Sequence, residues 1–123
     1  MKGKNSSCLL LYNTLSLSLT DLPDAPRNLD VVEINKNNVV LEWNPPRNDG
    51  GAPVKGYNVE RRQGYTNRFI NISKRLVLDT WYCDSNVQDG SDYEYRVTAE
   101  NEVGQGPPSK PVGPIFVREP FGK

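Results

Sequence analysis

The sequence DYEYRVTAEN, residues 92–101, alternates between apolar and polar side chains. Its apolar positions are Tyr93, Tyr95, Val97 and Ala99. Successive side chains of a β-strand point to opposite faces, so the pattern predicts an antiparallel strand with one buried side and one solvent-facing side. This segment favours an all-β fold, and the flanking sequence predicts the strands that accompany it.

Two segments nearer the N-terminus show related patterns. The segment NNVVLEW, residues 37–43, repeats the alternation. Its inward positions are Val39, Leu41 and Trp43. The segment PRNLDVVEI, residues 26–34, places Leu29 and Val31 on one face and then changes phase to reach Ile34. Such a phase change is typical of an edge strand with a β-bulge.

A third segment, VKGYNVERR at residues 54–62, points Tyr57 and Val59 inward. If it pairs with residues 92–101, its outward charges meet charges of opposite sign across the ladder. The expected pairs are Glu60 with Arg96 and Arg62 with Glu94. Exposed pairs contribute about 0.2–1 kcal/mol each, so we expect them to help set the register rather than to hold the fold together.

The remaining strands are less regular. Residues 64–86 predict one or two further strands whose phase the pattern does not fix. The segment EVGQGPP, residues 102–108, is predicted to be a hairpin loop. The last strand, KPVGPIFV at residues 110–117, contains Pro111 and Pro114, which cannot donate to a ladder and therefore place it at a sheet edge. Short strands separated by turn residues about every 8–12 positions are typical of an all-β sandwich or barrel.

The connection NPPRNDGGAP, residues 44–53, joins two of these strands. Pro45 and Pro46 end the first strand, and Pro53 restarts an extended path. The turn residues between them are Asp49, Gly50 and Gly51, and glycine makes a positive φ available there. We predict that this connection turns the chain and performs no chemistry.

The composition argues against most catalytic classes. The chain of 123 residues has 15 basic residues, 15 acidic residues and no histidine. Zero net charge gives no field that attracts nucleic acid or anionic lipid, and histidine is the commonest general base and metal ligand. No phosphate-binding loop or nucleophile elbow is present in the sequence. We therefore expect no enzyme, no cofactor, no metal site, and no nucleic-acid or membrane partner.

The first 21 residues differ from the rest, and we expect a disordered leader there. Their leucines follow two lysines, as in a secretory signal, but Asn13 and Thr14 split the apolar run. The run is also too short and too polar to span a membrane. Cys8, in this leader, and Cys83 lie in unrelated parts of the chain, so we expect both to be free thiols.

With these motifs in place, residues 22–117 resemble a fibronectin type III domain. The resemblance lies in the joint order and spacing of Pro26, Leu29 and Val31, of Trp43 and Tyr57, of V-x-x-G-x-x-Y at residues 87–93, and of YRVTAENEVGQGPPS. It implies a seven-strand antiparallel β-sandwich of the immunoglobulin-like class. The implied core residues are Trp43, Tyr57, Val87, Tyr93, Tyr95 and Val97. Tyr93 is implied to be a tyrosine corner, with its hydroxyl bonded to the backbone near Val87.

One position departs from the family pattern. Members of the family usually have an apolar residue three positions before Val87, where this chain has Asp84. An unpaired buried carboxylate is costly. Either the fifth strand is shifted so that Cys83 or Trp81 turns inward, or its end is locally loose, and we expect the shift.

A narrower resemblance starts from W-x-P-P-x-x-D-G-G-x-P-V-x-G-Y-x-V-E-R-R, residues 43–62, and includes the tail REPFGK. These motifs are similar to the fibronectin repeats of giant muscle proteins such as titin, twitchin and myosin-binding protein C. The resemblance implies a non-catalytic repeat in the cytoplasm of the sarcomere, which acts as a scaffold on the myosin thick filament and bears tension. Residues 118–123 are then the start of a linker to a neighbouring repeat, and the isolated domain is a monomer.

A second hypothesis keeps the fold but makes the domain an extracellular adhesion or receptor module. Asn5 and Asn71 each begin an N-x-S glycosylation sequence, which favours this alternative.

Two interpretations also stay open for the charged residues that end the segment 54–62. Arg61 and Arg62, outward beside Glu60, form a patch that binds an acidic protein surface, or they belong to an ordinary solvated face.

Overall fold

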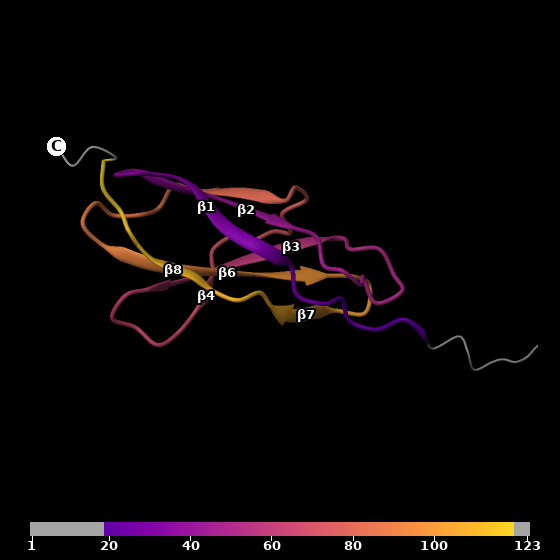
Figure 1. The fold of residues 1–123 in the computed structure, drawn as a ribbon. Helices are drawn as coiled ribbons and strands as arrows, with labels where there is room; N and C mark the ends of the chain where they lie inside the picture. Colours follow the sequence, from indigo (N-terminus) through magenta and orange to yellow (C-terminus); the bar gives the residue numbers. More distant parts are fainter. Residues whose placement is uncertain (1–18, 120–123) are drawn as a thin grey trace, which may run out of the picture.

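The computed structural model describes residues 19–119, which form two antiparallel β-sheets and no α-helix. The strands are β1 (Arg27–Asn35), β2 (Asn38–Asn44), β3 (Gly56–Gln63), β4 (Ile70–Asn71), β5 (Trp81–Asp84), β6 (Asp92–Glu100), β7 (Gln105–Pro108) and β8 (Val112–Phe116). One sheet has the order β1-β2-β5, and the other has the order β4-β3-β6 with β7 and β8 on the far side of β6 (Figure 1). The predicted antiparallel β-sandwich is confirmed.

The core lies between the two sheets, and β6 is the central strand of the larger one. β6 pairs with β3 along the whole length of β3. The buried apolar side chains are Val39, Leu41, Trp43, Tyr57, Val59, Tyr93, Tyr95, Val97, Ala99, Ile115 and Val117. The inward faces predicted for residues 37–43, 54–62 and 92–101 are therefore confirmed. On the outer face Thr98 is also buried, because Asn58 and Pro108 flank it in register.

β1 contains the irregularity that its sequence predicts. Its register with β2 shifts twice, the second time between Val31 and Glu33. These shifts allow Leu29, Val31 and Ile34 all to pack against the core despite their uneven spacing. The predicted bulged edge strand is confirmed.

The last edge of the larger sheet is broken into two strands. β7 pairs with the C-terminal half of β6, and β8 pairs with its N-terminal half. The expected loop at residues 102–108 is therefore wrong in its second half. Asn101 folds the chain back early, because its side-chain oxygen accepts hydrogen bonds from the backbone N–H groups of Val103 and Gly104. Three prolines without N–H groups interrupt the ladder and split the edge: Pro107, Pro108 and Pro111. Residues 19–119 therefore form eight strands rather than the expected seven.

Between β3 and β6 the chain forms β4 and β5, as one or two strands were predicted, but the expected shift of the fifth strand is wrong. Trp81 is 52% exposed, and Cys83 lies opposite Val40 on the outer face of the sheet. Asp84 itself turns into the sandwich opposite Val39 and is 3% exposed. The reason is an ion pair, described below.

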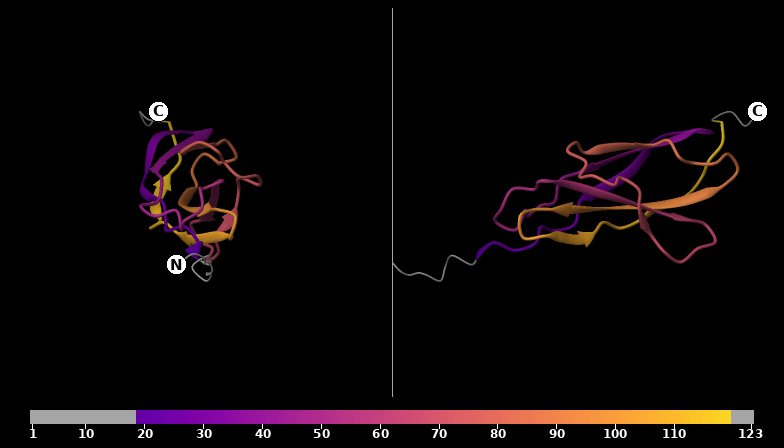
Figure 2. Two further views of the ribbon diagram at one scale, coloured as in Figure 1. Left: turned by 90° about the vertical axis from the view of Figure 1, so that its right-hand side faces the viewer. Right: turned by 180° about the vertical axis from the view of Figure 1, so that it is seen from behind.

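The described chain enters and leaves the sandwich at opposite ends (Figure 2). The entering segment lies beside the connection between β2 and β3, and the exit follows β8 (Figure 1). The two poles of the domain therefore hold different parts of the chain.

Candidate functional site

The pole at which the chain enters is built around a rigid turn between β2 and β3. The side-chain oxygen of Asn48 accepts a hydrogen bond from Gly50 N–H at 2.8 Å, and that of Asp49 accepts one from Gly51 N–H at 2.8 Å. Gly50 and Gly51 have φ values of +82° and +89°, which glycine adopts without strain. The predicted turn residues thus form two overlapping side-chain turns that fix the direction of the turn's carbonyl groups.

Those carbonyl groups hold the segment that enters the domain. The Asp21 N–H donates to the Gly50 carbonyl at 2.7 Å, and the Asp24 N–H donates to the Asn48 carbonyl at 2.9 Å. A Cβ atom at Gly50 would lie 2.2 Å from the Asp21 carbonyl oxygen, so the contact depends on glycine. Residues 19–21, which we expected to belong with the leader, therefore lie against the domain, whereas residues 1–18 of that leader are outside the described residues.

Asn101, at the end of β6, also binds the entering segment, and we call these contacts of the turn and Asn101 the grip on that segment. Its side-chain nitrogen donates to the carbonyls of Asp21 at 2.7 Å and Asp49 at 2.8 Å. Its side-chain oxygen accepts from Val103 and Gly104, so the whole hydrogen-bonding capacity of the amide is used. Sequence reasoning assigned Asn101 no role. The signal it offered was an asparagine directly after a strand with a glycine three positions later, which is typical of a side-chain turn.

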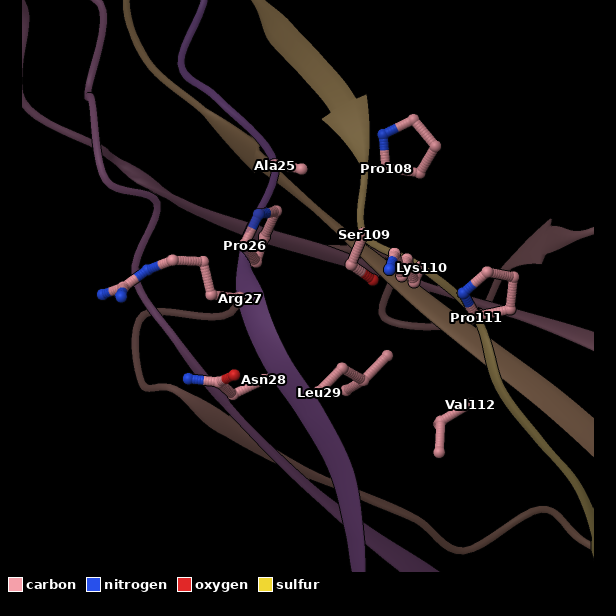
Figure 3. A pocket seen from close by; sticks show the side chains of 10 residues that line it. All are labelled: Ala25, Pro26, Arg27, Asn28, Leu29, Pro108, Ser109, Lys110, Pro111 and Val112. Carbon is pink, nitrogen blue, oxygen red and sulfur yellow. The ribbon is translucent and has the colours of Figure 1, made fainter.

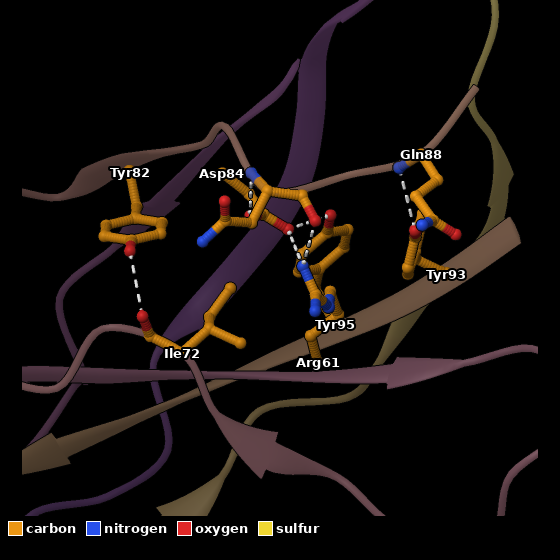
Figure 4. A network of polar contacts seen from close by, with 8 residues as sticks. Arg61, Ile72, Tyr82, Asp84, Gln88, Tyr93 and Tyr95 are labelled. Atoms are coloured by element: carbon orange, nitrogen blue, oxygen red, sulfur yellow. Dashed lines mark hydrogen bonds and ion pairs between the residues drawn. The ribbon is translucent and has the colours of Figure 1, made fainter. Parts of the chain in front are cut away.

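A buried polar network explains the position of Asp84 (Figure 4). One carboxylate oxygen accepts from the Arg61 guanidinium at 2.9 Å and from the Tyr95 hydroxyl at 2.6 Å, and the other accepts from Asn86 N–H at 3.1 Å. Burial, and then the hydrogen bond to Asp84, raise the pKa of Tyr95 far above its usual value. The carboxylate of Asp84 is buried because it is paired with Arg61. The expectation that Asp84 would stay out of the core assumed a carboxylate without a partner.

The predicted patch of Arg61 and Arg62 is divided between two sides of the sheet. The expectation of an outward Arg61 is wrong, because its side chain enters the sandwich and stacks over the Tyr93 ring at 4.9 Å. Arg62 lies on the outer face and pairs with Glu94. The structure therefore gives both arginines acidic partners within the domain.

The second predicted cross-strand pair forms on the same outer face. Arg96 Nε donates to Glu60 at 2.5 Å, and the Arg96 guanidinium lies over the Phe69 ring at 4.3 Å. Both expected pairs, Glu60 with Arg96 and Arg62 with Glu94, are confirmed.

The remaining implied residues lie in and around the core. Trp43 packs edge-on against Tyr57, with ring centroids 5.4 Å apart. The Tyr93 hydroxyl accepts a hydrogen bond from Gln88 N–H at 2.9 Å, next to the partly buried Val87. This bond ties the loop before β6 to the strand, as a tyrosine corner does.

A groove of about 630 Å³ opens between the start of β1 and the break between β7 and β8 (Figure 3). Residues 25–29 and 108–112 line it, and they include no acid, histidine or cysteine. The Ser109 hydroxyl is buried and occupied, since it accepts a hydrogen bond from Val97 N–H at 3.0 Å. The groove follows from the broken edge strand, and its one amine, Lys110, has no acid, histidine or cysteine beside it in the lining.

Two further kinds of site can be checked in the described residues, a metal-holding cluster and a reactive thiol. No group of three or more His, Cys, Asp or Glu within residues 19–119 is placed to hold a metal ion. Cys83 is a free thiol, and burial, Asp84 and Glu33 raise its pKa, which disfavours the reactive thiolate. Cys8 is outside the described residues. No helix within residues 19–119 is long and apolar enough to cross a membrane.

Taken together, the sandwich, its opposite poles and the grip on the entering chain define a structural β-sandwich module. The model of the fibronectin type III domain matches residues 24–114, and the chain belongs to that family.

Its relatives include giant and multidomain muscle proteins. The chain is 36% identical over 105 residues to fast-type myosin-binding protein C of Mus musculus. The aligned region covers 83% of this chain and 9% of that protein. Among solved structures, domains A168–A170 of titin match with a TM-score of 0.76 and 32% identity over 80% of this chain and 33% of theirs. The twitchin kinase region of C. elegans matches with a TM-score of 0.77 and 29% identity over 84% of this chain and 18% of its own. The chain therefore corresponds to a small part of such proteins.

Proposed function

We propose that this chain is a non-catalytic repeat of a multidomain intracellular muscle protein. Residues 22–117, with the entering segment 19–21 held against them, are the repeat, and residues 118–123 begin the linker to its neighbour. The repeat acts as a scaffold on the myosin thick filament and bears tension along the array. Similarity to myosin-binding protein C, titin and twitchin repeats supports the class. The observation that carries the mechanical role is the grip on the entering segment by Gly50 and Asn101.

The hydrogen bonds between the two poles indicate the path along which tension passes through the domain. Tension enters where Asp21 is held and leaves beyond β8, at the opposite pole (Figure 2). The bonds to the entering segment are loaded first. The force then acts along β1 and β8, which must slide against β2 and β6. Several ladder hydrogen bonds break together in that motion, so we expect a discrete unfolding event.

Single-molecule pulling on an array that contains this repeat tests the mechanical role. Asn101→Ala removes four hydrogen bonds at the entry pole, so we expect a lower unfolding force and a wider range of angles to the preceding domain. The matched control is Asn67→Ala in the exposed loop before β4. Gradual yielding without a discrete event would contradict tension bearing. A discrete event that Asn101→Ala leaves unchanged would show that the grip is not on the load path.

The proposed partner is the thick filament, and co-sedimentation of the multidomain array with myosin filaments tests it. A protein-binding role of Arg61 and Arg62 stays a prediction. Arg62→Glu tests it without disturbing the buried pair of Arg61 and Asp84. Unchanged binding to the filaments would rule out a binding role for Arg62. Sedimentation of the isolated domain checks that it is a monomer.

Of the features that favour the extracellular alternative, the glycosylation sequence at Asn71 is the one that lies within the described residues. Asn71 is exposed at the end of β4, and its side chain bonds to Asn58 and to the Lys74 N–H. Expression in secretory cells separates the two functions. Protein that leaves the cell with a glycan on Asn71 would support the adhesion or receptor module and defeat the muscle assignment.

A further inference from the structure

The outer face of the β1-β2-β5 sheet is acidic, and its carboxylates have no basic partner among residues 19–119. The pairing registers place these side chains on it: Asp30, Glu33, Val40, Glu42, Trp81 and Cys83. The three strands contain one basic residue, Arg27, whose guanidinium donates to the Pro45 carbonyl at the start of β1. The three carboxylates form none of the ion pairs found within residues 19–119.

The larger sheet is different, because both arginines on its outer face pair with glutamates of that face. Arg62 pairs with Glu94, and Arg96 pairs with Glu60, on neighbouring strands. The chain as a whole has zero net charge. The acidic face of β1-β2-β5 therefore differs in that none of its carboxylates pairs with a basic side chain within residues 19–119.

The acidic face also carries an unfavourable pair. Asp30 lies directly opposite Glu42 in the β1–β2 register. Like charges directly opposite each other destabilise a sheet. Natural proteins accept such local conflicts mainly where the surface has a function. A positive charge placed between the two carboxylates would remove the repulsion.

Apolar side chains adjoin the carboxylates. Trp81 lies opposite Glu42 on this face and is 52% exposed, and Leu78, just before β5, is 78% exposed. A shallow groove runs beside them, lined by residues 77–83 other than Thr80. An exposed tryptophan ring attracts both apolar groups and the guanidinium or ammonium groups of basic side chains.

We propose that this face is a docking surface for a basic segment of another protein. Lysine or arginine side chains of that segment lie over Asp30, Glu33 and Glu42, and an apolar or arginine side chain packs on Trp81. The carboxylates form no metal-holding group within residues 19–119, so their spread suits several cations rather than one ion. Their charge repels nucleic acid and anionic lipid. The proposal does not depend on the muscle assignment.

An NMR titration of the full 123-residue chain tests the proposal. The probe is a peptide of about 12 alternating lysines and alanines, which is long enough to cross three strands spaced about 4.8 Å apart. We expect saturable amide shifts in β1, β2 and β5 and in the Trp81 indole signal, and weaker binding as salt rises. Shifts centred on β3 and β6, no saturable shifts, or equal binding of a glutamate–alanine peptide would overturn the proposal.

Charge variants separate the face from net charge. The variant D30N/E33Q/E42Q should bind the lysine peptide roughly tenfold more weakly, because three exposed pairs are lost. The control variant D24N/D89N/E102Q makes the same change of net charge at exposed positions off this face and should bind almost as the parent chain does. Equal weakening in both variants would reject a specific surface.

Stability provides an independent readout that does not need the peptide. Asp30→Asn should raise Tm, because it removes the repulsion from Glu42. A fall in Tm would overturn the inference that the two carboxylates repel each other.

Discussion

Replacing Arg61 tests whether Asp84 is tolerated in the sandwich only because of its partner. Arg61→Met retains much of the side chain's length and deletes its charge. Asp84 then keeps the Tyr95 hydroxyl and the Asn86 N–H as donors, but loses the guanidinium bond at 2.9 Å. Breaking a buried pair by removing one partner costs about 3–5 kcal/mol, since the other charge stays buried. We expect about 3 kcal/mol, because two hydrogen bonds remain.

That loss is large beside the roughly 5–15 kcal/mol by which domains are stable. It should lower Tm by roughly 12–24 °C, at about 4–8 °C for each kcal/mol in a domain of this size. Urea unfolding followed by the fluorescence of the buried Trp43 measures the free energy of unfolding. The matched control is Arg62→Met, which breaks a pair on the outer face and should cost less than about 1 kcal/mol.

A double variant shows whether the buried charge is the cause. Arg61→Met combined with Asp84→Leu removes both charges, and apolar replacements of buried pairs are often neutral or stabilising. The double variant should therefore be more stable than Arg61→Met alone, although the Tyr95 hydroxyl loses its acceptor. A loss below about 1 kcal/mol in the single variant, or a double variant as unstable as the sum of both singles, would refute the reasoning.

Three further predictions concern the core and the entry pole. Burial and the bond to Asp84 raise the pKa of Tyr95 above its usual 10.0, so the folded state keeps a proton that the unfolded chain loses. Stability should therefore fall as the pH rises above 10, and Tyr95→Phe should make that fall shallower in alkaline urea titrations. Trp43→Ala should cost about 3–5 kcal/mol in thermal unfolding, through loss of the central packing. Gly50→Ala should release the entering segment, seen as faster hydrogen exchange at Asp21, whereas Gly90→Ala, at a similar φ in open space, should not.

The strand faces could be predicted because their signals are local. Residues 92–101 keep a period of two, and pairing them with residues 54–62 brings opposite charges together at matching positions. The bulge in β1 could be predicted for the same reason, since Ile34 is out of phase with Val31 within one strand.

The placement of Asp84 could not be predicted from its own strand, because its partner lies on the facing sheet. The burial cost that argued against an inward Asp84 applies only to an unpaired carboxylate. The sequence still held a usable signal. Alternate residues of β3 point inward, so the spacing from Tyr57 and Val59 puts Arg61 at an inward position. Arg61 and Asp84 therefore each place a charge where the strand pattern calls for an apolar side chain, and the two charges have opposite signs. Two such violations on facing sheets predict a buried pair.

The β2–β3 connection shows most clearly why a loop's role is hard to infer from composition. Its prolines and glycines predict a turn, but they do not indicate what the turn's carbonyls accept. Here the donor is the backbone of Asp21, in a segment that the family pattern does not include. Removing that segment would leave a donor of Asn101, a side chain only 1% exposed, without its partner. The turn therefore binds another segment of the same chain. That entering segment is part of the repeat's structure.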